Sequence, residues 1–180
     1  MSIIEDNEGL IIKLKAFDMG AIEWVFDQYN DAIYRYSYRL LGNQDKAEEC
    51  VAETFSRLLQ ALKMGKGPKK YVRPYLYRTA HNWITDQYRR STPEETELVE
   101  EIHSTDQQVE EEVITQIENS KIRRVLWELP ENQRQAVVLK FLEGMENQEI
   151  AQTMNKPVGA VKALQQRGLQ AIRKKLKVKL

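Results

Sequence analysis

Residues 147–175 carry the clearest indication of the fold: they read NQEIAQTM, then NKP, then VGAVKALQQRGLQAIRKK. In the first and third of these segments apolar residues recur every three or four positions, the spacing of amphipathic helices. The Asn-Lys-Pro segment between them stops a helix and turns the chain. A short helix, a tight turn and a longer helix make up a helix-turn-helix, which we therefore predict here.

The longer helix of this motif, residues 158–175, is expected to present two different faces. Its apolar side is predicted to consist of Val161, Leu164, Gly168, Leu169, Ile172 and Leu176. Its other side carries short, polar and cationic side chains, namely Gly159, Ala160, Lys162, Ala163, Gln166, Arg167, Gln170 and Arg173. Such side chains suit the major groove: Gln166 matches an adenine edge, Arg167 a guanine or a phosphate, and the lysines the phosphates. The plainer alternative is a basic helical hairpin that binds no DNA.

The rest of the chain is also predicted to be helical. Glycine and proline are sparse, and the alternation typical of strands is absent. Further helices are predicted at 18–41, started by an Asp18 cap and stopped at Gly42, and at 45–62, started by a capping box of Asp45 and Glu48. Others are predicted at 72–90, 117–129 and 131–143, with a loop at 64–70 and a stop at Gly144. The predicted fold class is all-α.

The 180 residues carry 27 Lys plus Arg and 27 Asp plus Glu, but these charges are segregated along the chain. The net charges are −1 over residues 1–16, +3 over 17–90, −10 over 91–120 and +8 over 121–180. Two basic blocks therefore flank an acidic connector. Basic blocks of this kind favour a polyanionic partner, whereas ordinary solvated helix faces explain the segregation less well.

The loop at 64–70 and the helix after it interleave cations with aromatic rings. This mixture suits unpaired nucleic-acid strands, in which bases stack on rings while cations follow the backbone. The candidate residues are Lys66, Lys69, Lys70, Tyr71, Arg78, Asn82, Asp86 and Arg89. Rings at these spacings also occur in ordinary cores, and Trp83 is expected to be one of those.

Enzymatic and cofactor sites are not indicated. His81 and His103 lie in different segments without a nucleophile partner, so a surface role is expected for each. Residues 65–67, Gly-Lys-Gly, lack the ending of a phosphate loop, and no His or Cys cluster has metal-ligand spacing. The single Cys50 excludes a disulfide framework and is expected to be buried. We predict no catalytic residue, no metal, no cofactor, no signal peptide, no membrane insertion and a cytoplasmic location.

Two sets of motifs resemble those of a bacterial RNA polymerase sigma factor of the extracytoplasmic-function (ECF) group. The first set is YRLLGNQDKAEECVAETF at 38–55 with YLYRTAHNWITDQYRR at 75–90, which resembles sigma region 2. The second is LPENQR at 129–134, FLEG at 141–144, EIA at 149–151 and PVGAVK at 157–162, which resembles sigma region 4. Their order and spacing cover nearly the whole chain.

The resemblance implies a promoter-specificity factor without catalysis of its own. It implies a region 2 domain at 1–92, an acidic linker at 93–118 and a region 4 domain at 119–180. The implied partners are core RNA polymerase at its clamp and flap, promoter DNA in duplex and single-stranded form, and an anti-sigma factor. By similarity, the polymerase-binding residues are Asp45, Glu48, Glu49, Glu53 and Phe55.

The same resemblance divides the DNA candidates between two promoter elements. The loop 64–70 would hold a flipped base of the minus-ten element, beside Asn82, Asp86 and Arg89, and the last helix would read the minus-thirty-five element. The alternative function is a stand-alone helix-turn-helix regulator that binds duplex DNA without polymerase. Binding of unpaired DNA by the N-terminal block separates the two, since a repressor needs no such activity.

Overall fold

The computed structural model describes residues 7–90 and 120–178, and every regular element within these ranges is helical. We call 7–90 the N-terminal lobe and 120–178 the C-terminal lobe. The N-terminal lobe contains α1 (Asn7–Lys15), α2 (Met19–Leu41), α3 (Gln44–Lys63) and α4 (Val72–Arg90). The C-terminal lobe contains a helical segment at 120–127, α6 (Glu131–Val137), the π-helix η3 (Val138–Leu142), α7 (Asn147–Met154) and α8 (Val158–Val178). The predicted all-α class is confirmed.

The start of α2 has the predicted cap, whereas the start of α3 has a different one. The Asp18 side chain caps α2 as predicted, and Gly42 ends it in the left-handed conformation at φ 64°. The predicted capping box of Asp45 and Glu48 is wrong, because the cap of α3 is Asn43, whose side-chain oxygen accepts the Lys46 N–H at 2.9 Å. Asn43 directly follows the left-handed glycine, so the second helix begins as soon as the first has ended.

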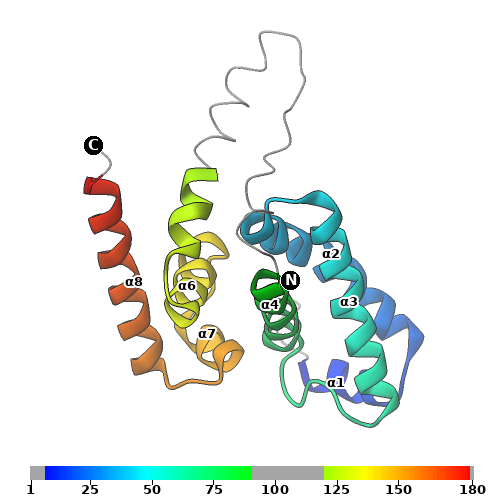
Figure 1. Cartoon of the computed structure of the whole chain (residues 1–180). Helices are drawn as coiled ribbons and strands as arrows, with labels where there is room; N and C mark the ends of the chain where they lie inside the picture. The colour runs from blue at the N-terminus through cyan, green and yellow to red at the C-terminus, as the bar shows by residue number, and fades with distance from the viewer. Residues whose placement is uncertain (1–6, 91–119, 179–180) are drawn as a thin grey trace, which may run out of the picture.

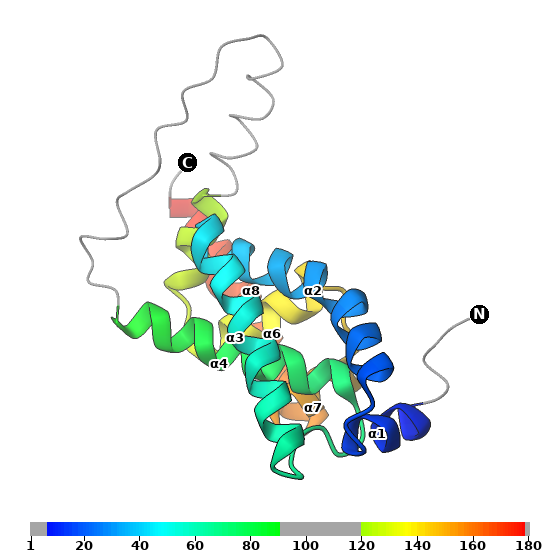
Figure 2. The same ribbon diagram turned by 90° about the vertical axis from the view of Figure 1, so that its right-hand side faces the viewer.

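Three helices form the core of the N-terminal lobe. α2, α3 and α4 pack on one another, and α1 lies across one end of this group (Figure 1, Figure 2). Their facing sides bury Val25, Ile33, Tyr36, Leu76 and Ile84 almost completely, as the helical periodicity requires. Cys50 and Trp83 are buried as predicted.

His81 lies inside this core, so its predicted surface role is wrong. Its ring is 3% exposed, and its Nδ1 lies 2.7 Å from the Tyr36 hydroxyl. Its Nε2 lies 3.3 Å from the Thr85 hydroxyl. Burial, assisted by the charge of Arg134, lowers the pKa of His81 to about 3. The imidazole is therefore neutral in the folded protein. His103 lies outside the described residues.

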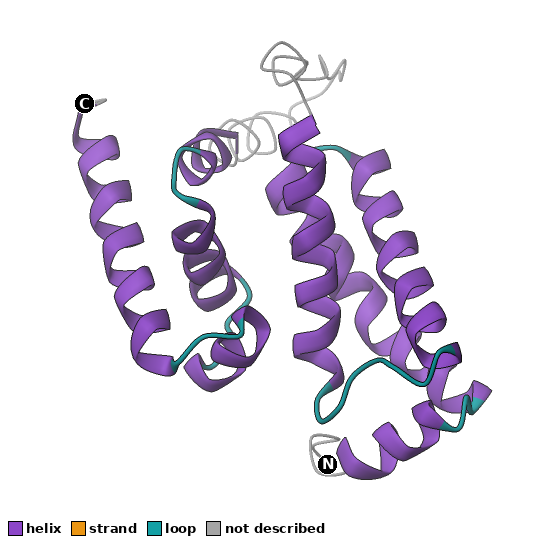
Figure 3. Ribbon diagram, turned by 60° about the horizontal axis from the view of Figure 1, so that its bottom comes forward, coloured by secondary structure: helices purple, strands orange, loops and turns teal. Residues whose placement is uncertain are grey.

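The C-terminal lobe contains the predicted helix-turn-helix. α7 has the predicted bounds, and Asn155 ends it with a left-handed φ of 53° before α8 begins (Figure 3). α8 approaches α6 so closely that a Cβ at Gly168 would lie 2.6 Å from Val137 Cγ2. A buried amide, Gln165, donates a hydrogen bond to Asn147 Oδ1 at 2.9 Å and braces α8 against the start of α7.

Two details of this lobe differ from the sequence-based expectation. The helix predicted at 131–143 changes from α to π at Val138, and it stops before Gly144, whose φ is 65°. The periodicity places Leu176 on the apolar side of α8, yet Leu176 is 50% exposed. The helical start predicted for the acidic connector lies outside the described residues.

The two lobes touch each other along α4. Figure 1 shows α4 between the α2–α3 pair and the C-terminal lobe, and α4 packs directly on α7. No helix in the described part of the chain combines the length and apolar character needed to cross a membrane.

Candidate nucleic-acid interface

The predicted duplex-reading face of α8 is open to solvent. Val161 and Ile150 are fully buried at the contact of α7 with α8, which fixes the orientation of the longer helix. On the other side of α8 the candidate residues are exposed, apart from the half-buried Ala163; they are Gly159, Ala160, Lys162, Gln166, Arg167 and Arg173. The structure thus brings all seven candidates onto one helix. Such a face can place amide and guanidinium groups at base edges and cations at phosphates.

Lys175, a cation near the end of α8, already has a protein partner. Lys175 Nζ lies 2.6 Å from Glu128 Oε2, and this ion pair joins α8 to the chain just after the helical segment at 120–127. Lys175 therefore positions α8, whereas Arg173 is exposed.

The loop between α3 and α4 presents the cations predicted for it. Residues 64–70 lie outside the helices, and the loop is drawn in teal in Figure 3. Lys66, Lys69 and Lys70 are exposed. The Lys70 ammonium lies 5.1 Å from the centre of the half-buried Tyr71 ring. A cation and a ring next to each other are the components needed for a backbone phosphate and an unpaired base.

All four candidate residues on α4 are exposed. Asn82, Asp86, Arg78 and Arg89 are exposed, but Thr85 is buried beside His81. Both arginines also contact the C-terminal lobe. Arg78 Nε donates to the carbonyl oxygen of Thr153 at 2.9 Å, and Arg89 Nη2 lies 2.9 Å from Glu131 Oε2.

Trp127 is the aromatic residue at this face that sequence reasoning missed. The ring of Tyr88, in the last turn of α4, stacks on Trp127 with centroids 3.6 Å apart and an interplanar angle of 5°. Trp127 Nε1 donates to the carbonyl oxygen of Leu40 at 2.6 Å. The guanidinium carbon of Arg134 lies 3.8 Å from the centre of the Trp127 ring. The only signal for Trp127 in the sequence is its position just before the LPENQR motif at 129–134.

The start of α3 carries the predicted acidic residues. Asp45, Glu48 and Glu49 are exposed, while Glu53 is half-buried and pairs with Arg57 at 2.8 Å. They form an acidic surface suited to a basic protein partner.

Phe55, the fifth polymerase-binding candidate, has a different environment. It is 8% exposed and lies edge-on to Phe26, at a centroid distance of 4.9 Å. Phe26 is itself 45% exposed, although the periodicity places it on the inward stripe of α2. Both rings, with Leu58 and Leu59, line a hollow of about 440 Å³ between α2 and α3. Phe55 therefore forms part of the wall of this hollow and is not exposed like the acidic candidates.

No group of His, Cys, Asp and Glu side chains in the described ranges is arranged to hold a metal ion.

Comparisons with known proteins match both halves of the chain. The family models for Sigma-70 region 2 and for Sigma-70, region 4 match residues 25–93 and 120–172. The chain is 31% identical over 179 residues to ECF RNA polymerase sigma factor SigW of Bacillus subtilis (strain 168), covering 93% of this chain and 95% of that protein. It is 27% identical over 166 residues to ECF RNA polymerase sigma factor BldN of Streptomyces coelicolor, covering 91% of this chain and 63% of that one.

Solved structures show the same fold. CnrH, described in complex with the cytosolic domain of CnrY, aligns with a TM-score of 0.73 at 18% identity, over 96% of this chain and 97% of that one. The sigma factor RpoE from Bartonella quintana, in complex with the anti-sigma factor NepR, aligns with a TM-score of 0.58 at 17% identity, over 87% and 96% of the two chains. With region 2 and region 4 in sequence and a relative matched along nearly its whole length, this chain belongs to the ECF family of RNA polymerase sigma factors, which bind core polymerase and direct it to promoters.

Proposed function

We propose that three surfaces of this sigma factor each bind a different target. α8 reads the minus-thirty-five element as duplex, the 64–70 loop and the exposed face of α4 bind the unpaired minus-ten element, and the acidic start of α3 binds the polymerase clamp. The observation that carries this proposal is the placement of an exposed, polar recognition helix on one lobe and a cation-and-ring surface on the other. A stand-alone duplex-binding regulator is not favoured, because it has no use for the second surface.

This proposal keeps the domain limits expected from the sequence, with region 2 at 1–92, an acidic linker at 93–118 and region 4 at 119–180. It also places the protein in the cytoplasm, where core polymerase and promoter DNA are found. We further propose regulation by an anti-sigma factor, supported by the complex described for the Bartonella relative.

The minus-thirty-five assignment is tested by selecting duplexes from a random library with the purified chain and with Gln166→Ala and Arg167→Ala. Each removed base contact is expected to relax selection at one position, by about 1–3 kcal/mol of discrimination. The matched control is Lys174→Ala, an exposed cation in the last turns of the same helix. It should leave the selected sequence unchanged. An identical selected sequence in both test variants would overturn the assigned face.

The minus-ten assignment is tested with a fluorescent single-stranded DNA of random sequence. Lys69→Ala with Lys70→Ala is expected to weaken binding and to lower the salt slope by about 0.7 for each phosphate that is no longer neutralised. Lys13→Ala with Lys15→Ala, two exposed cations of α1, removes the same charge at another site. Equal losses of affinity in the two double variants would show a diffuse charge effect and contradict a site at the loop.

The clamp assignment is tested by capture of core RNA polymerase. Glu48→Lys with Glu49→Lys reverses two exposed acids on α3 and is expected to abolish capture while leaving DNA binding by α8 intact. Glu8→Lys reverses an exposed acid on α1, away from the start of α3, as a control. Undiminished capture by the α3 variant would contradict the assignment.

A further inference from the structure

The three most exposed large apolar side chains of the described ranges lie at one end of the N-terminal lobe. Ile12 of α1 is 68% exposed, Met19 at the start of α2 is 60% exposed, and Met64 directly after α3 is 66% exposed. α2 and α3 pack on each other and are joined by a short turn, so they run antiparallel and Met19 lies at the same end as Met64. α1 crosses this end of the lobe, as Figure 1 and Figure 2 both show. Three helices therefore present apolar side chains to solvent at one place.

The direction of Ile12 follows from the buried side of α1. Ile11 and Leu14 are buried against the lobe. Because successive side chains of an α-helix are about 100° apart, the opposite side of α1 carries Ile12, Lys13 and Ala16. All three are exposed. The outward side of α1 therefore combines an apolar side chain with a cation.

Lysines accompany these apolar side chains. Lys63 Nζ lies 5.9 Å from the centre of the Phe17 ring, which places the end of α3 next to the turn between α1 and α2. The acids exposed at this end are Glu8 and Asp18, and Asp18 is engaged as the cap of α2. We call the exposed apolar and cationic residues together the basal surface; they are Ile12, Lys13, Lys15, Met19, Lys63, Met64 and Lys66. None of its lysines forms an ion pair with another described residue.

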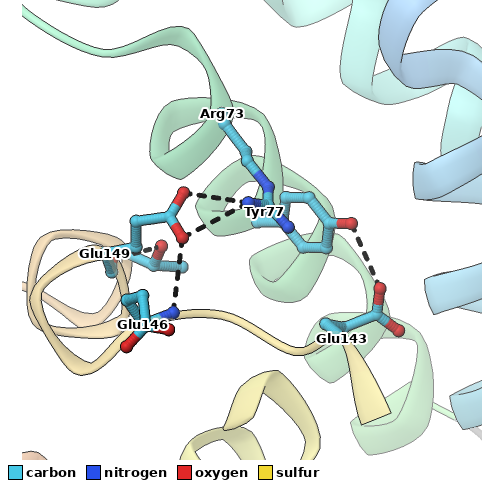
Figure 4. A network of polar contacts seen from close by, with 6 residues as sticks. Arg73, Tyr77, Glu143, Glu146 and Glu149 are labelled. Atoms are coloured by element: carbon cyan, nitrogen blue, oxygen red, sulfur yellow. Dashed lines mark hydrogen bonds and ion pairs between the residues drawn. The ribbon is translucent and has the colours of Figure 1, made fainter. Parts of the chain in front are cut away.

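Cations elsewhere in this lobe are neutralised by the protein itself. Three arginines pair with carboxylates of the C-terminal lobe, namely Arg39 with Glu143 at 2.7 Å, Arg73 with Glu149 at 3.0 Å and Arg89 with Glu131 at 2.9 Å. Figure 4 shows the Arg73 pair beside the Tyr77 hydroxyl, which donates to Glu143 Oε2 at 3.1 Å. The lysines of the basal surface differ from these arginines, because their charge is available to an external anion.

The composition of the basal surface matches an anionic lipid surface. Lipid phosphates attract lysines, and apolar side chains beside those lysines can enter the boundary between headgroups and acyl chains. An unpaired nucleic-acid strand would use the lysines too, but its bases need rings to stack on. The ring at this end, Phe17, is half-buried, whereas the exposed apolar side chains are aliphatic. Exposed apolar side chains grouped in this way mark an interaction surface, and the observations favour lipid over a strand.

We propose that the basal surface binds anionic membranes peripherally. Three aliphatic side chains and a few lysines make a reversible contact, not an anchor. The binding itself does not rest on the proposed promoter contacts. One consequence does: Met64 and Lys66 belong to the 64–70 loop, so a chain that lies on a membrane by this surface turns the start of that loop towards the lipid. The membrane-bound factor then cannot offer the loop to a minus-ten strand.

The test is co-sedimentation of the full chain with vesicles of phosphatidylcholine alone and of phosphatidylcholine with an equal part of phosphatidylglycerol. The chain is expected to bind only the second kind. Ile12→Ser with Met19→Ser and Met64→Ser keeps every charge and should weaken that binding about tenfold or more. The matched control changes three exposed apolar residues of the C-terminal lobe, as Ile122→Ser, Phe141→Ser and Leu176→Ser, and should bind like the native chain.

The contribution of the lysines is measured in the same assay. Lys13→Gln with Lys15→Gln and Lys63→Gln should weaken binding by about fivefold for each lysine removed. Lys121→Gln with Arg124→Gln and Lys174→Gln removes the same charge from exposed positions of the C-terminal lobe. No binding to the anionic vesicles, or equal losses in the test and control variants, would overturn the proposal, since equal losses mean diffuse attraction.

A label and a DNA titration separate lipid from strand. Met64→Cys, labelled with an environment-sensitive fluorophore, should shift to the blue on anionic vesicles, whereas labelled Phe141→Cys should not. The variant with Ile12, Met19 and Met64 changed to serine should bind single-stranded DNA of random sequence like the native chain. If that variant loses DNA affinity as strongly as vesicle affinity, the surface belongs to the strand and the lipid proposal is wrong. Failure of vesicle binding leaves the proposed minus-ten role of Lys69 and Lys70 unaffected, because their DNA titration is independent of lipid.

Discussion

His81 is the group for which the structure predicts a defined pH effect on stability. The folded protein lowers its pKa to about 3, from 6.5 in the unfolded chain. The unfolded state therefore binds the proton more tightly, so the stability that His81 contributes is complete above about pH 6.5 and is lost as the pH falls towards 3. At about 1.4 kcal/mol per pH unit, the loss between about pH 7.5 and about pH 4.5 is roughly 2.7 kcal/mol.

The matched perturbation is His81→Gln, which removes the titrating ring and keeps an amide able to bind the Tyr36 and Thr85 hydroxyls. Urea unfolding of both proteins, followed by the helical circular dichroism signal, gives a free energy of unfolding at each pH. We expect the variant to be less stable at neutral pH but to lose about 2–3 kcal/mol less than the native chain on acidification. Subtracting one profile of unfolding free energy against pH from the other removes the contribution of the carboxylates, which both proteins share. Parallel profiles would refute the reasoning.

Three further predictions concern single side chains of the described lobes. Gly168→Ala should destabilise the protein by about 1–3 kcal/mol in thermal or urea unfolding, because its Cβ would lie 2.6 Å from Val137 Cγ2. Cys50, buried with its pKa raised to about 11, should resist alkylation at about pH 8 until the chain is unfolded, as mass spectrometry with a thiol reagent can show. Arg173→Ala should weaken binding to every duplex sequence and flatten the salt slope by about 0.9, as binding titrations at several salt concentrations can measure.

Each of these predictions has an internal control. Gly159 lies in the first turn of α8, and a methyl group added there would have nothing within 4 Å, so Gly159→Ala should not destabilise the protein. Equal destabilisation at both glycines would show that close packing on α6 is not the cause. Rapid alkylation of Cys50 in the native protein would contradict its burial. A change in preferred sequence for Arg173→Ala would show that Arg173 contacts bases.

The helices and the candidate faces are largely predictable because they depend on local sequence. The stop at Gly42, the bounds of α7 and the exposed face of α8 follow from side-chain spacing, glycine conformation and helix capping. The capping residue of α3 was predicted wrongly for a local reason too. Asn and Asp are equally good helix caps, so the sequence alone does not decide between Asn43 and Asp45.

The remaining features depend on contacts between distant parts of the chain. His81 is polar and lies between candidate strand-binding residues, but the Tyr36 hydroxyl supplied by α2 allows it to be buried. Trp127 shows no role in its own segment, because its stacking partner Tyr88 and its hydrogen-bond acceptor, the carbonyl oxygen of Leu40, come from the other lobe. The pairing of Arg78 with the end of α7 likewise arises only from the packing of the lobes. Sequence periodicity contains no information on such pairings.

Transcription in vitro with bacterial core RNA polymerase, the purified chain and a library of randomised promoters tests the central claim most directly. Sigma activity predicts transcripts above the level of core enzyme alone, from templates enriched in two sequence blocks. Arg167→Ala should alter the upstream block, and Lys69→Ala with Lys70→Ala should reduce initiation without altering that block. Transcription no higher than that of core enzyme alone, or transcripts without any selected sequence, would contradict the account.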